Sequence, residues 1–457
     1  MNATAIDYIN TETLKPRKDG LDHIPGEKGW PVIGKTLDFV KDASGLLQSL
    51  REKYNSPVVK VCLAGNWIVV VTGPDAIEMI LMDRERAFSA KFGNGLPMGV
   101  MFKRGLMLRD FEDHKMHRKT MQPAFRSDAM KYYAQQMNSF AAEQIPHWGD
   151  DGDVIKFYST IKQFTLDFGA LVFVGVPLGE DSDKLNSAFV DTVLATVAPV
   201  KKGIPFTSYK RGLDGRKYLE EYFYQLLGEK RNSTEQDMFS QYAQATNDKG
   251  ERFTDDEVID HMIFLLMAAH DTITSSITTM VKALATHTDW QEKVRQELLA
   301  LGTETLQFDD LSNLPITDQV FFEALRLYSP VPYLNRRTIK EVEIDGVKIP
   351  ENTQIMLDAH HTHHMSQWWD NPEQFDPDRF GAERNEQGRH KFSWVPFGGG
   401  VHKCLGLHFA QHLARVFLFH FLSNYRFELA DPSVDEPIAQ VPMPRPVNRL
   451  PLRLTRI

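Results

Sequence analysis

The stretch FGGGVHKCLG, from Phe397 to Gly406, places one of the chain's two cysteines just after three consecutive glycines. Helix-forming residues continue from this stretch, so we expect Cys404 near the N-terminus of the last helix. Unpaired backbone N–H groups at such a position lower the pKa of a thiol and donate hydrogen bonds to a thiolate sulfur. The glycines allow a tight turn and bring bare backbone against a flat partner. The pattern indicates a thiolate held against a large planar group.

Other interpretations of this loop remain open on the residues alone. A buried structural cysteine after a glycine-rich turn is the plainest one. An acyl-transfer nucleophile is another, although the sequence does not show which histidine would serve it. A phosphate-binding loop is disfavoured because there is no GKS or GKT tail and no preceding βαβ unit. A zinc site is disfavoured because no second cysteine stands at ligand spacing.

The totals exclude several classes of protein. The chain has 457 residues, 42% of them hydrophobic, which is enough for a large core. Its 52 basic and 61 acidic residues give a net charge of −9, without the basic footprint of nucleic-acid binding. Cys62 and Cys404 cannot form a disulfide framework, which favours a reducing, cytoplasmic location. Apolar stretches such as Met262–Ala269 fall short of the roughly 18 residues that span a membrane, so we expect no membrane anchor.

Hydrophobic periodicity and turn signals predict a mainly helical chain with a minor share of β-sheet. The longest predicted helix begins at a capping box formed by Thr254 and Glu257 and runs to about Ala285. No linker or repeat divides the sequence, so we treat residues 1–457 as a single domain. The other predicted elements are a hairpin over Pro57–Gly73 with its turn at Gly65-Asn66, helices over most of Arg109–Lys230 with a break at Ala198–Phe206, a helix from about Thr288, and a hairpin that turns at Asp345-Gly346.

The stretch from Phe397 to Gly406 resembles the haem-ligand loop of the cytochrome P-450 family, whose pattern is F-x-x-G-x-[H/R]-x-C-x-G. The resemblance implies that Cys404 is the thiolate ligand of the iron in haem b (iron protoporphyrin IX), and such a ligand favours O–O cleavage. It implies a triangular, mainly α-helical prism around the buried haem, with a small β-rich lobe mainly from about residues 24–75 and 331–358. It also implies further haem contacts: Phe397 shielding the sulfur, Gly398 and Gly406 lying against the porphyrin, His402 reaching a propionate, and Ala410 packing on the porphyrin face.

Two further motifs of the family stand in the expected order. The segment EALR supplies Glu323 and Arg326, three residues apart on one helical face, and FDPDRF supplies Arg379. On their own, Glu323 and Arg326 would make an ordinary surface ion pair. In the family such residues form a buried network, which must be complete because removing one member leaves an uncompensated charge. The resemblance therefore gives these three residues a structural role.

The long helix contains AAHDTI, which begins at Ala268 and resembles the family's [A/G]-G-x-[D/E]-T pattern, with Ala269 in place of the usual glycine. Asp and Thr are poor choices for the middle of a helix. Thr272 could simply donate to the carbonyl of the preceding turn. The resemblance instead implies that Ala268 and this turn face bound O₂, that Thr272 holds a water, and that Asp271 relays protons as a catalytic group. We expect His270 to point to another face.

Basic residues elsewhere have spacings that the family uses for the two haem propionates. The segment HKMHRK places His114 and Arg118 one helical turn apart. The segment NRRT supplies Arg336 and Arg337, of which we favour Arg336 from its spacing to the following hairpin. Cationic side chains that converge on two carboxylates make charge-assisted hydrogen bonds.

The function that the resemblance implies is a monooxygenase that inserts one atom of O₂ into a lipophilic substrate, such as a terpenoid, a steroid or a fatty acid. No flavin or nicotinamide domain fits the remaining sequence, so we expect electrons from a separate ferredoxin or flavodoxin with its reductase. Lys115, Lys119 and Lys403 form a candidate patch for such an acidic partner, and ordinary solvated lysines explain them nearly as well. A haem-thiolate peroxygenase or isomerase and a non-enzymatic haem sensor are the alternatives, which the Asp271-Thr272 pair disfavours. The expected substrate walls are Phe88–Met107, Ala198–Phe206, Val331–Leu334 and Pro442–Val447.

Two other segments resemble functional motifs, but we assign neither of them the function of its motif. HHTHH, from His360 to His364, suggests a metal cluster, but neighbouring side chains on the extended segment that we expect there point to opposite faces. GNGLPMG, from Gly93 to Gly99, is a near miss to a dinucleotide-binding loop. It does not follow a predicted strand, so we expect a loop over the substrate pocket.

Overall fold

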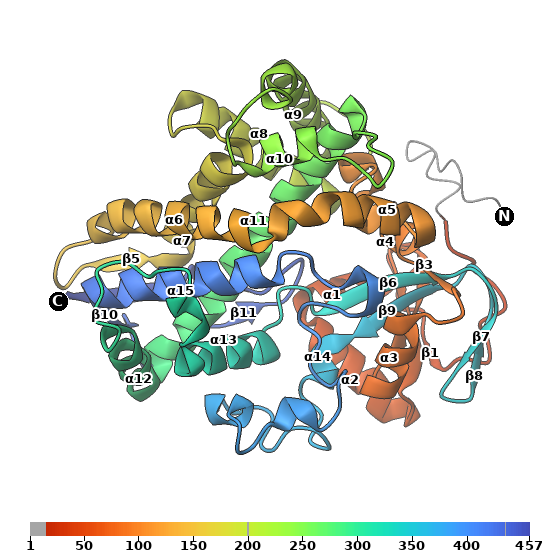
Figure 1. The fold of residues 1–457 in the computed structure, drawn as a ribbon. Helices are drawn as coiled ribbons and strands as arrows, with labels where there is room; N and C mark the ends of the chain where they lie inside the picture. Colours follow the sequence, from red (N-terminus) through yellow and green to blue (C-terminus); the bar gives the residue numbers. More distant parts are fainter. Residues whose placement is uncertain (1–14, 199–200, 435) are drawn as a thin grey trace.

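The computed structural model describes residues 15–198, 201–434 and 436–457. Helices dominate, and they surround the long helix α11 (Asp255–Thr286), which crosses the molecule obliquely in Figure 1. The predicted mainly helical fold with a minor share of β-sheet is confirmed. The other α-helices are α1 (Thr36–Lys41), α2 (Ala43–Tyr54), α3 (Pro74–Met82), α4 (Ala90–Phe102), α5 (Phe111–Met121), α6 (Ser127–Gln144), α7 (Phe157–Gly169), α8 (Glu180–Thr196), α9 (Ser208–Lys230), α10 (Met238–Gln244), α12 (Thr288–Leu299), α13 (Pro315–Leu327), α14 (Ala359–Thr362) and α15 (Leu407–Asn424).

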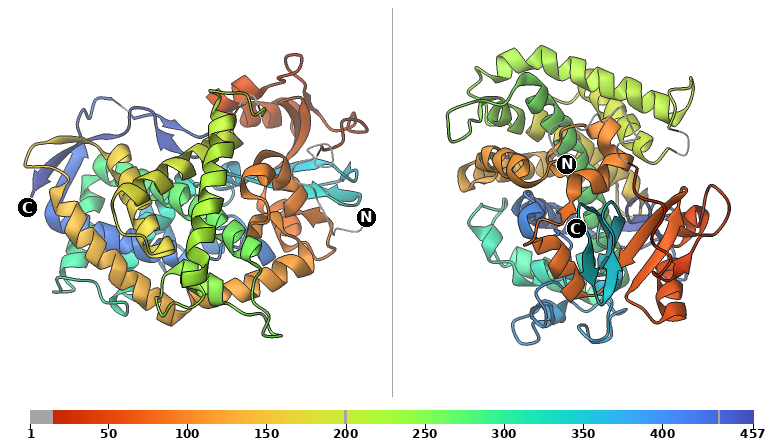
Figure 2. Two further views of the ribbon diagram at one scale, coloured as in Figure 1. Left: turned by 90° about the horizontal axis from the view of Figure 1, so that it is seen from above. Right: turned by 90° about the vertical axis from the view of Figure 1, so that its right-hand side faces the viewer.

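The largest sheet has six strands, and Figure 2 shows it to one side of the helices. Its order is β1-β2-β3-β9-β6-β4, with β1 (Gly26–Glu27), β2 (Val58–Leu63), β3 (Asn66–Val71), β9 (Gln354–Asp358), β6 (Tyr333–Thr338) and β4 (Phe88–Ser89). The smaller sheets join β5 (Val154–Lys156), β10 (Tyr425–Leu429) and β13 (Pro451–Arg456), then β7 (Val342–Ile344) with β8 (Val347–Ile349), and β11 (Ile438–Ala439) with β12 (Arg445–Pro446). The division of the chain into domains stays a prediction.

Helix α11 has the capped start that its sequence predicts. The side chain of Thr254 accepts a hydrogen bond from the backbone N–H of Glu257, whose carboxylate accepts one from the N–H of Thr254. The helix spans 32 residues, roughly 48 Å at 1.5 Å per residue. It is therefore long enough to bring its middle turns into the centre of the protein.

Both predicted hairpins are confirmed. Strands β2 and β3 pair antiparallel, with Val61 opposite Ile68, although the turn lies one residue earlier than predicted, at Ala64-Gly65. Strands β7 and β8 turn at Asp345-Gly346. In the large sheet successive side chains alternate between two faces, one packed against α3 and the other against α2. The sheet thereby fixes the direction of each residue of β6, which matters for the site.

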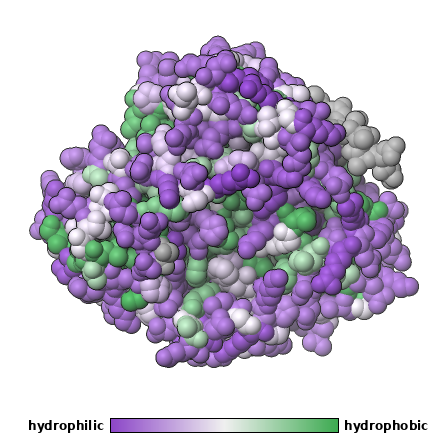
Figure 3. Space-filling model, in the orientation of Figure 1, coloured by the Kyte–Doolittle hydropathy of each residue, from purple (hydrophilic) through white to green (hydrophobic). Residues whose placement is uncertain are grey.

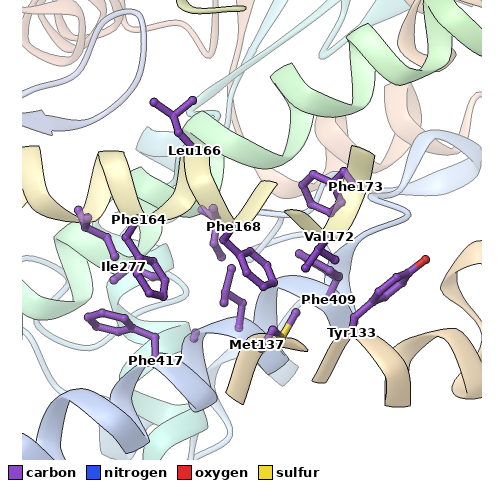
Figure 4. Close-up of a cluster of buried hydrophobic side chains, with 14 of the residues drawn as sticks. Tyr133, Met137, Phe164, Leu166, Phe168, Val172, Phe173, Ile277, Phe409 and Phe417 are labelled. Carbon is purple, nitrogen blue, oxygen red and sulfur yellow. The ribbon is translucent and has the colours of Figure 1, made fainter. Parts of the chain in front are cut away.

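The main hydrophobic core lies between helices that flank α11 (Figure 4). Phe164 on α7 packs against Phe417 on α15, with ring centroids 6.2 Å apart, and Phe168 lies 6.3 Å from Phe409. These aromatic contacts join α7 to α15, the helix that follows the cysteine loop. They give the loop a rigid support.

The segment from Gly93 to Gly99 is not a loop, contrary to our expectation, because helix α4 runs through it. Ser89 caps the helix by accepting from the N–H of Phe92, and the Asp110 carboxylate accepts from the N–H groups of Ala90 and Lys91. A Cβ atom on Gly93 would lie 2.6 Å from the Cα of Arg336. Glycine in this helix thus allows close packing on β6, and the caps outweigh its poor helix propensity.

The face of the molecule in Figure 3 is mostly hydrophilic, with apolar residues in scattered patches. Among the described residues, no helix combines the length and the hydropathy that crossing a membrane requires. The predicted break at Ala198–Phe206 separates α8 from α9, and residues 199–200 within it lie outside the described part of the chain.

Candidate active site

The loop before α15 is folded tightly against α3. Gly398 and Gly400 have φ angles of 64° and 60°, in the left-handed region that favours glycine. A Cβ atom on Gly400 would lie 1.9 Å from the carbonyl oxygen of Leu81 on α3. The N–H of Cys404 donates to the carbonyl of Phe397 over 2.9 Å and closes the loop. Glycine at position 400 is therefore needed for both its φ angle and the close approach to α3, and the loop presents Cys404 three residues before α15 begins.

Cys404 is enclosed by protein and yet accessible. Its side chain is exposed, whereas Cys62 is buried in β2. Burial raises the pKa of the Cys404 thiol, against the opposing effects of the Gly406 backbone N–H, Arg118 and Lys403. The thiol is therefore open on one side and surrounded by protein groups on the others. The Gly406 N–H group and the cations of Arg118 and Lys403 are groups of the kind that stabilise a thiolate.

One face of α11 also borders open space. Phe264, Ala268 and Thr272 are partly exposed, although the residues between them are mostly buried. Their spacing of four residues places them in a row on one side of the helix. Phe264 and, on the cysteine side, Phe397 and Ala410 are partly buried side chains packed against the same hydrophobic core.

Thr272 and Asp271 have different surroundings. The hydroxyl of Thr272 donates to the carbonyl of Ala268 over 2.7 Å, so the backbone hydrogen bond considered from the sequence is present. Its oxygen still has lone pairs to accept a hydrogen bond. Oδ1 of Asp271 lies 3.0 Å from Nδ1 of His270, whose ring packs against Phe189 on α8 and the Lys162 carbonyl on α7.

Four basic side chains that we predicted from separate motifs meet in one cluster. The rings of His114 and His402 lie 3.9 Å apart between centroids. Burial, followed by Arg118 and Arg336, lowers the pKa of His114 to about 4. Burial, followed by Arg336, His114 and Arg118, also lowers the pKa of His402. These mutual effects show that the four groups share one environment.

No carboxylate among the described residues forms an ion pair with Arg118 or Arg336. Nη1 of Arg336 donates only to the carbonyl of Asn335, and burial lowers the pKa of this guanidinium, with Asp110 and Asp83 acting more weakly in the other direction. Buried cations need counter-charges. Arg118 and Arg336 lack one, and His114 and His402, which their lowered pKa values keep neutral near pH 7, add N–H donors beside them. This set fits a ligand that carries carboxylates, and the propionates of a haem meet that requirement.

Arg337 lies outside this cluster. It follows Arg336 on β6 and so points to the opposite face of the sheet. Its Nη2 donates to the side chain of Gln354 over 3.1 Å, and burial lowers its pKa to about 10. The structure thus brings Arg336, rather than Arg337, beside His402.

Glu323, Arg326 and Arg379 form a network that is completely buried. Arg326 donates to both carboxylate oxygens of Glu323 over 2.7 and 2.8 Å, and Nε of Arg379 donates to one of them over 3.0 Å. Sequence reasoning missed a fourth member, Glu386, which accepts from Arg379 over 2.7 Å. Nothing in the residues around Glu386 marks it, because its partner is fixed only by the fold.

The histidine-rich segment is short helix rather than extended chain, which corrects our expectation. The Asp358 side chain accepts from the N–H of His361 and caps α14. Nε2 of His363 accepts from the N–H of Val395 over 2.9 Å, so this histidine supports the approach to the cysteine loop. Within the described ranges there is no group of three or more side chains placed to hold a metal ion.

The three candidate lysines differ in their surroundings. Lys119 forms an ion pair with Asp248. Lys115 on α5 and Lys403 beside the cysteine are exposed. Lys115 and Lys403 are thus the two members available to an acidic partner.

Comparison with known proteins identifies the family. Residues 24–450 match the sequence model described as Cytochrome P450. The chain belongs to the cytochrome P450 family. The putative cytochrome P450 136 of Mycobacterium tuberculosis is 35% identical to this P450 over 446 residues, which cover 96% of this chain and 90% of that protein. Abscisic acid 8′-hydroxylase 4 of Arabidopsis thaliana is 27% identical, covering 94% and 92%.

Solved structures agree on the fold. The retinoic acid-bound cyanobacterial CYP120A1 superposes with a TM-score of 0.86 at 25% identity, covering 95% of this chain and 99% of that one. The resemblance seen in the cysteine loop is therefore confirmed, as is the P450 fold. This P450 is a monooxygenase, and its cofactor is a haem bound through a cysteine thiolate. It uses O₂, an organic substrate and electrons from a redox partner.

Proposed function

We propose that Cys404 is the haem ligand of this P450 and that the enzyme hydroxylates a lipophilic small molecule, with the overall balance R–H + O₂ + 2e⁻ + 2H⁺ → R–OH + H₂O. The observation that carries the proposal is the thiol of Cys404, enclosed by protein yet accessible, with cations beside it. The other cysteine, Cys62, is buried within β2 and has no such space.

The remaining residues of the site hold and orient the cofactor. His114, Arg118, Arg336 and His402 bind its propionates, which supply the missing counter-charge. Small residues, Ala268 and Ala410, would pack against the cofactor, and Phe397, Gly398 and Gly406 would lie beside the thiolate that holds it. When bound, the haem supplies the oxygen chemistry, which its thiolate ligand promotes.

Asp271 and Thr272 move protons into the cavity. Because the Thr272 hydroxyl donates to the carbonyl of Ala268, its oxygen is directed as an acceptor and holds a water that donates to it. Asp271 on the same turn passes protons towards this water. Thr272 thus positions a water, and Asp271 delivers a proton to it.

The substrate lies against helix α4, the first residues of β6 and the segment around β12. These elements belong to three of the predicted wall segments, Phe88–Met107, Val331–Leu334 and Pro442–Val447. The chain segments there are rich in Phe, Met, Val and Pro, which suits an apolar ligand. Two relatives have names that state a ligand, retinoic acid in one and abscisic acid in the other. We therefore expect a terpenoid, a steroid or a fatty-acid-like molecule. Electrons come from a separate ferredoxin or flavodoxin.

The absorption spectrum of the reduced, CO-bound holoenzyme tests the ligand assignment. We expect the long-wavelength Soret band of a thiolate-ligated haem in the wild type and in Cys62→Ser, and its loss in Cys404→Ser. A Cys404→Ser variant that keeps this band would overturn the assignment.

The substrate class is tested separately by adding retinoic acid, abscisic acid, a steroid and a fatty acid to the ferric holoenzyme. Displacement of the axial water by none of them would overturn the proposed substrate class.

A further inference from the structure

The acid at the centre of α11 has an unusual neighbour. Side chains of adjacent helical residues normally diverge. In α11 they do not, since Nδ1 of His270 lies 3.0 Å from Oδ1 of Asp271. The imidazole is almost completely buried at 5% exposure, whereas the carboxylate is 21% exposed. The contact therefore joins a buried imidazole to a carboxylate that reaches open space.

Packing from two other helices holds the His270 ring in this position. The ring of Phe189 on α8 meets it edge-on, with centroids 5.6 Å apart. Its Nε2 lies 3.4 Å from the carbonyl oxygen of Lys162 on α7. With Nε2 directed to α7, Nδ1 is the ring nitrogen left for Asp271. It lies 3.0 Å from the carboxylate without being aligned for a hydrogen bond, and no other group among the described residues satisfies it.

The groups that face Asp271 are mainly cationic. They are His270 on α11, Lys162 and Tyr158 on α7, and Arg445 on β12. Burial opposes ionisation of Asp271, but His270, Lys162 and Arg445 outweigh it and hold the carboxyl pKa below its ordinary value. A carboxylate held in its ionised form is a poor source of protons near neutral pH. It needs a neighbour to supply each proton that it passes on.

We infer that His270 and Asp271 work as a pair, in which His270 positions Asp271 and supplies the proton that Asp271 passes into the cavity. This rests on the proposed role of Asp271. The step is a pure proton transfer: the Nδ1–H bond of the imidazolium breaks, an O–H bond forms on Asp271, and both groups become neutral. Asp271 then releases the proton towards Thr272, and His270 takes up another from solvent. Imidazole is the side chain suited to such exchange near neutral pH.

Kinetics of the holoenzyme test this pair with Asp271→Asn, His270→Gln and His270→Asn. His270→Asn keeps a hydrogen-bond donor beside Asp271 but cannot exchange a proton. We expect both His270 variants to lower product formed per electron pair about 100-fold and to release more peroxide. The double variant with His270→Gln and Asp271→Asn should form little less product per electron pair than Asp271→Asn alone, because the two residues act in series. Haem content and the CO spectrum should stay normal, as in the control His287→Gln.

The outcomes separate this inference from the proposed function. If Asp271→Asn is impaired and His270→Asn couples like the wild type, His270 supplies no proton and the inference is wrong. If Asp271→Asn also couples normally, the proposed role of Asp271 fails first. An independent readout is the imidazole NMR signal of His270 in the diamagnetic, reduced CO complex. Its chemical shift should differ between the wild type and Asp271→Asn at the same pH because the neighbouring negative charge is gone, and an unchanged shift would refute the pairing.

Discussion

Glu323 on α13 and Asp271 on α11 are both carboxylates surrounded by cations, but they are held in opposite ways. Glu323 is completely buried, and its two oxygens accept hydrogen bonds from Arg326, Arg379 and the N–H of Asp376. Asp271 has one partner within ion-pair distance, His270, and keeps a fifth of its side chain exposed.

The difference lies in how much hydrogen-bonding capacity is left. Glu323 accepts four hydrogen bonds and is completely buried between two guanidinium groups, so a proton on it would weaken the network, and it serves the scaffold. A carboxylate with free capacity beside open space can exchange protons and partners. Saturation of the carboxylate, rather than its charge environment, thus separates the structural acid from the acid proposed for chemistry.

Removing the charge of Glu323 should have the largest effect on stability. Glu323→Gln leaves Arg326 and Arg379 buried with one counter-charge fewer, which should cost about 3–5 kcal/mol. We expect little folded holoenzyme, measured as haem content per protein and as the midpoint of thermal unfolding. Glu383→Gln, at an exposed position between Arg379 and Glu386, is the control. Wild-type stability in Glu323→Gln would remove the distinction between the two acids.

Glu257 offers an intermediate case. Its carboxylate lies 3.3 Å from Nε2 of the buried His117, and this interaction, ahead of the Thr254 contacts, lowers its pKa from 4.5 to about 2 although burial opposes the shift. A depressed pKa adds stability that is present above pH 4.5 and is lost as the pH falls towards 2. Glu257→Gln keeps the capping box and should cost about 1–3 kcal/mol at neutral pH.

The pH dependence is the sharper part of this prediction. The stability gap between wild type and Glu257→Gln, measured by denaturant unfolding, should narrow as the pH falls below 4.5. Glu229 is exposed, so Glu229→Gln should have the same stability as the wild type at every pH. A gap that stays constant with pH would mean that the ion pair with His117 contributes nothing.

Short-range signals explain what could be predicted from the sequence. The capping box at Thr254 and the turn at Asp345-Gly346 depend on residues within a few positions of each other, and both appear as expected. The loop around Cys404 was readable for the same reason, since its glycines, its cysteine and the helix start follow one another directly. Order along the chain then linked this loop to the other motifs.

Long-range contacts explain what could not be predicted. The glycines of α4 suggested a loop because nothing nearby shows that Asp110 will cap this helix or that Gly93 will lie against β6. Glu386 joins the Glu323 network by accepting from Arg379, a contact that no local pattern announces. Nothing in the residues near His270 shows that its ring will lie beside the Asp271 carboxylate, because the packing of Phe189 and α7 holds it there.

Asp271→Asn should have the opposite effects to Glu323→Gln, with little change in stability and a large loss of product formation. With one close partner and partial exposure, the loss of charge should change stability by less than about 1 kcal/mol. Product formation should fall about 100-fold, the usual size of a proton-transfer contribution. Unfolding midpoints and turnover, measured on the same preparations, test both halves. An unstable variant with normal turnover would place Asp271 with the structural acids.

The smallest effect on the fold should come from Lys115, which is exposed on α5 beside the propionate-binding residues. If this surface receives an acidic electron donor, Lys115→Glu should slow reduction several-fold at low salt, and the difference should shrink as salt rises, because screening weakens exposed charges. Reduction by a [2Fe–2S] ferredoxin with its reductase, followed by stopped flow, measures this, with Lys217→Glu on α9 as the charge-matched control. Substrate binding and stability should be unchanged in both. Equal rates in the two variants would mean that electrons arrive elsewhere, and that Lys115 is a solvated lysine whose charge serves neither the scaffold nor the chemistry.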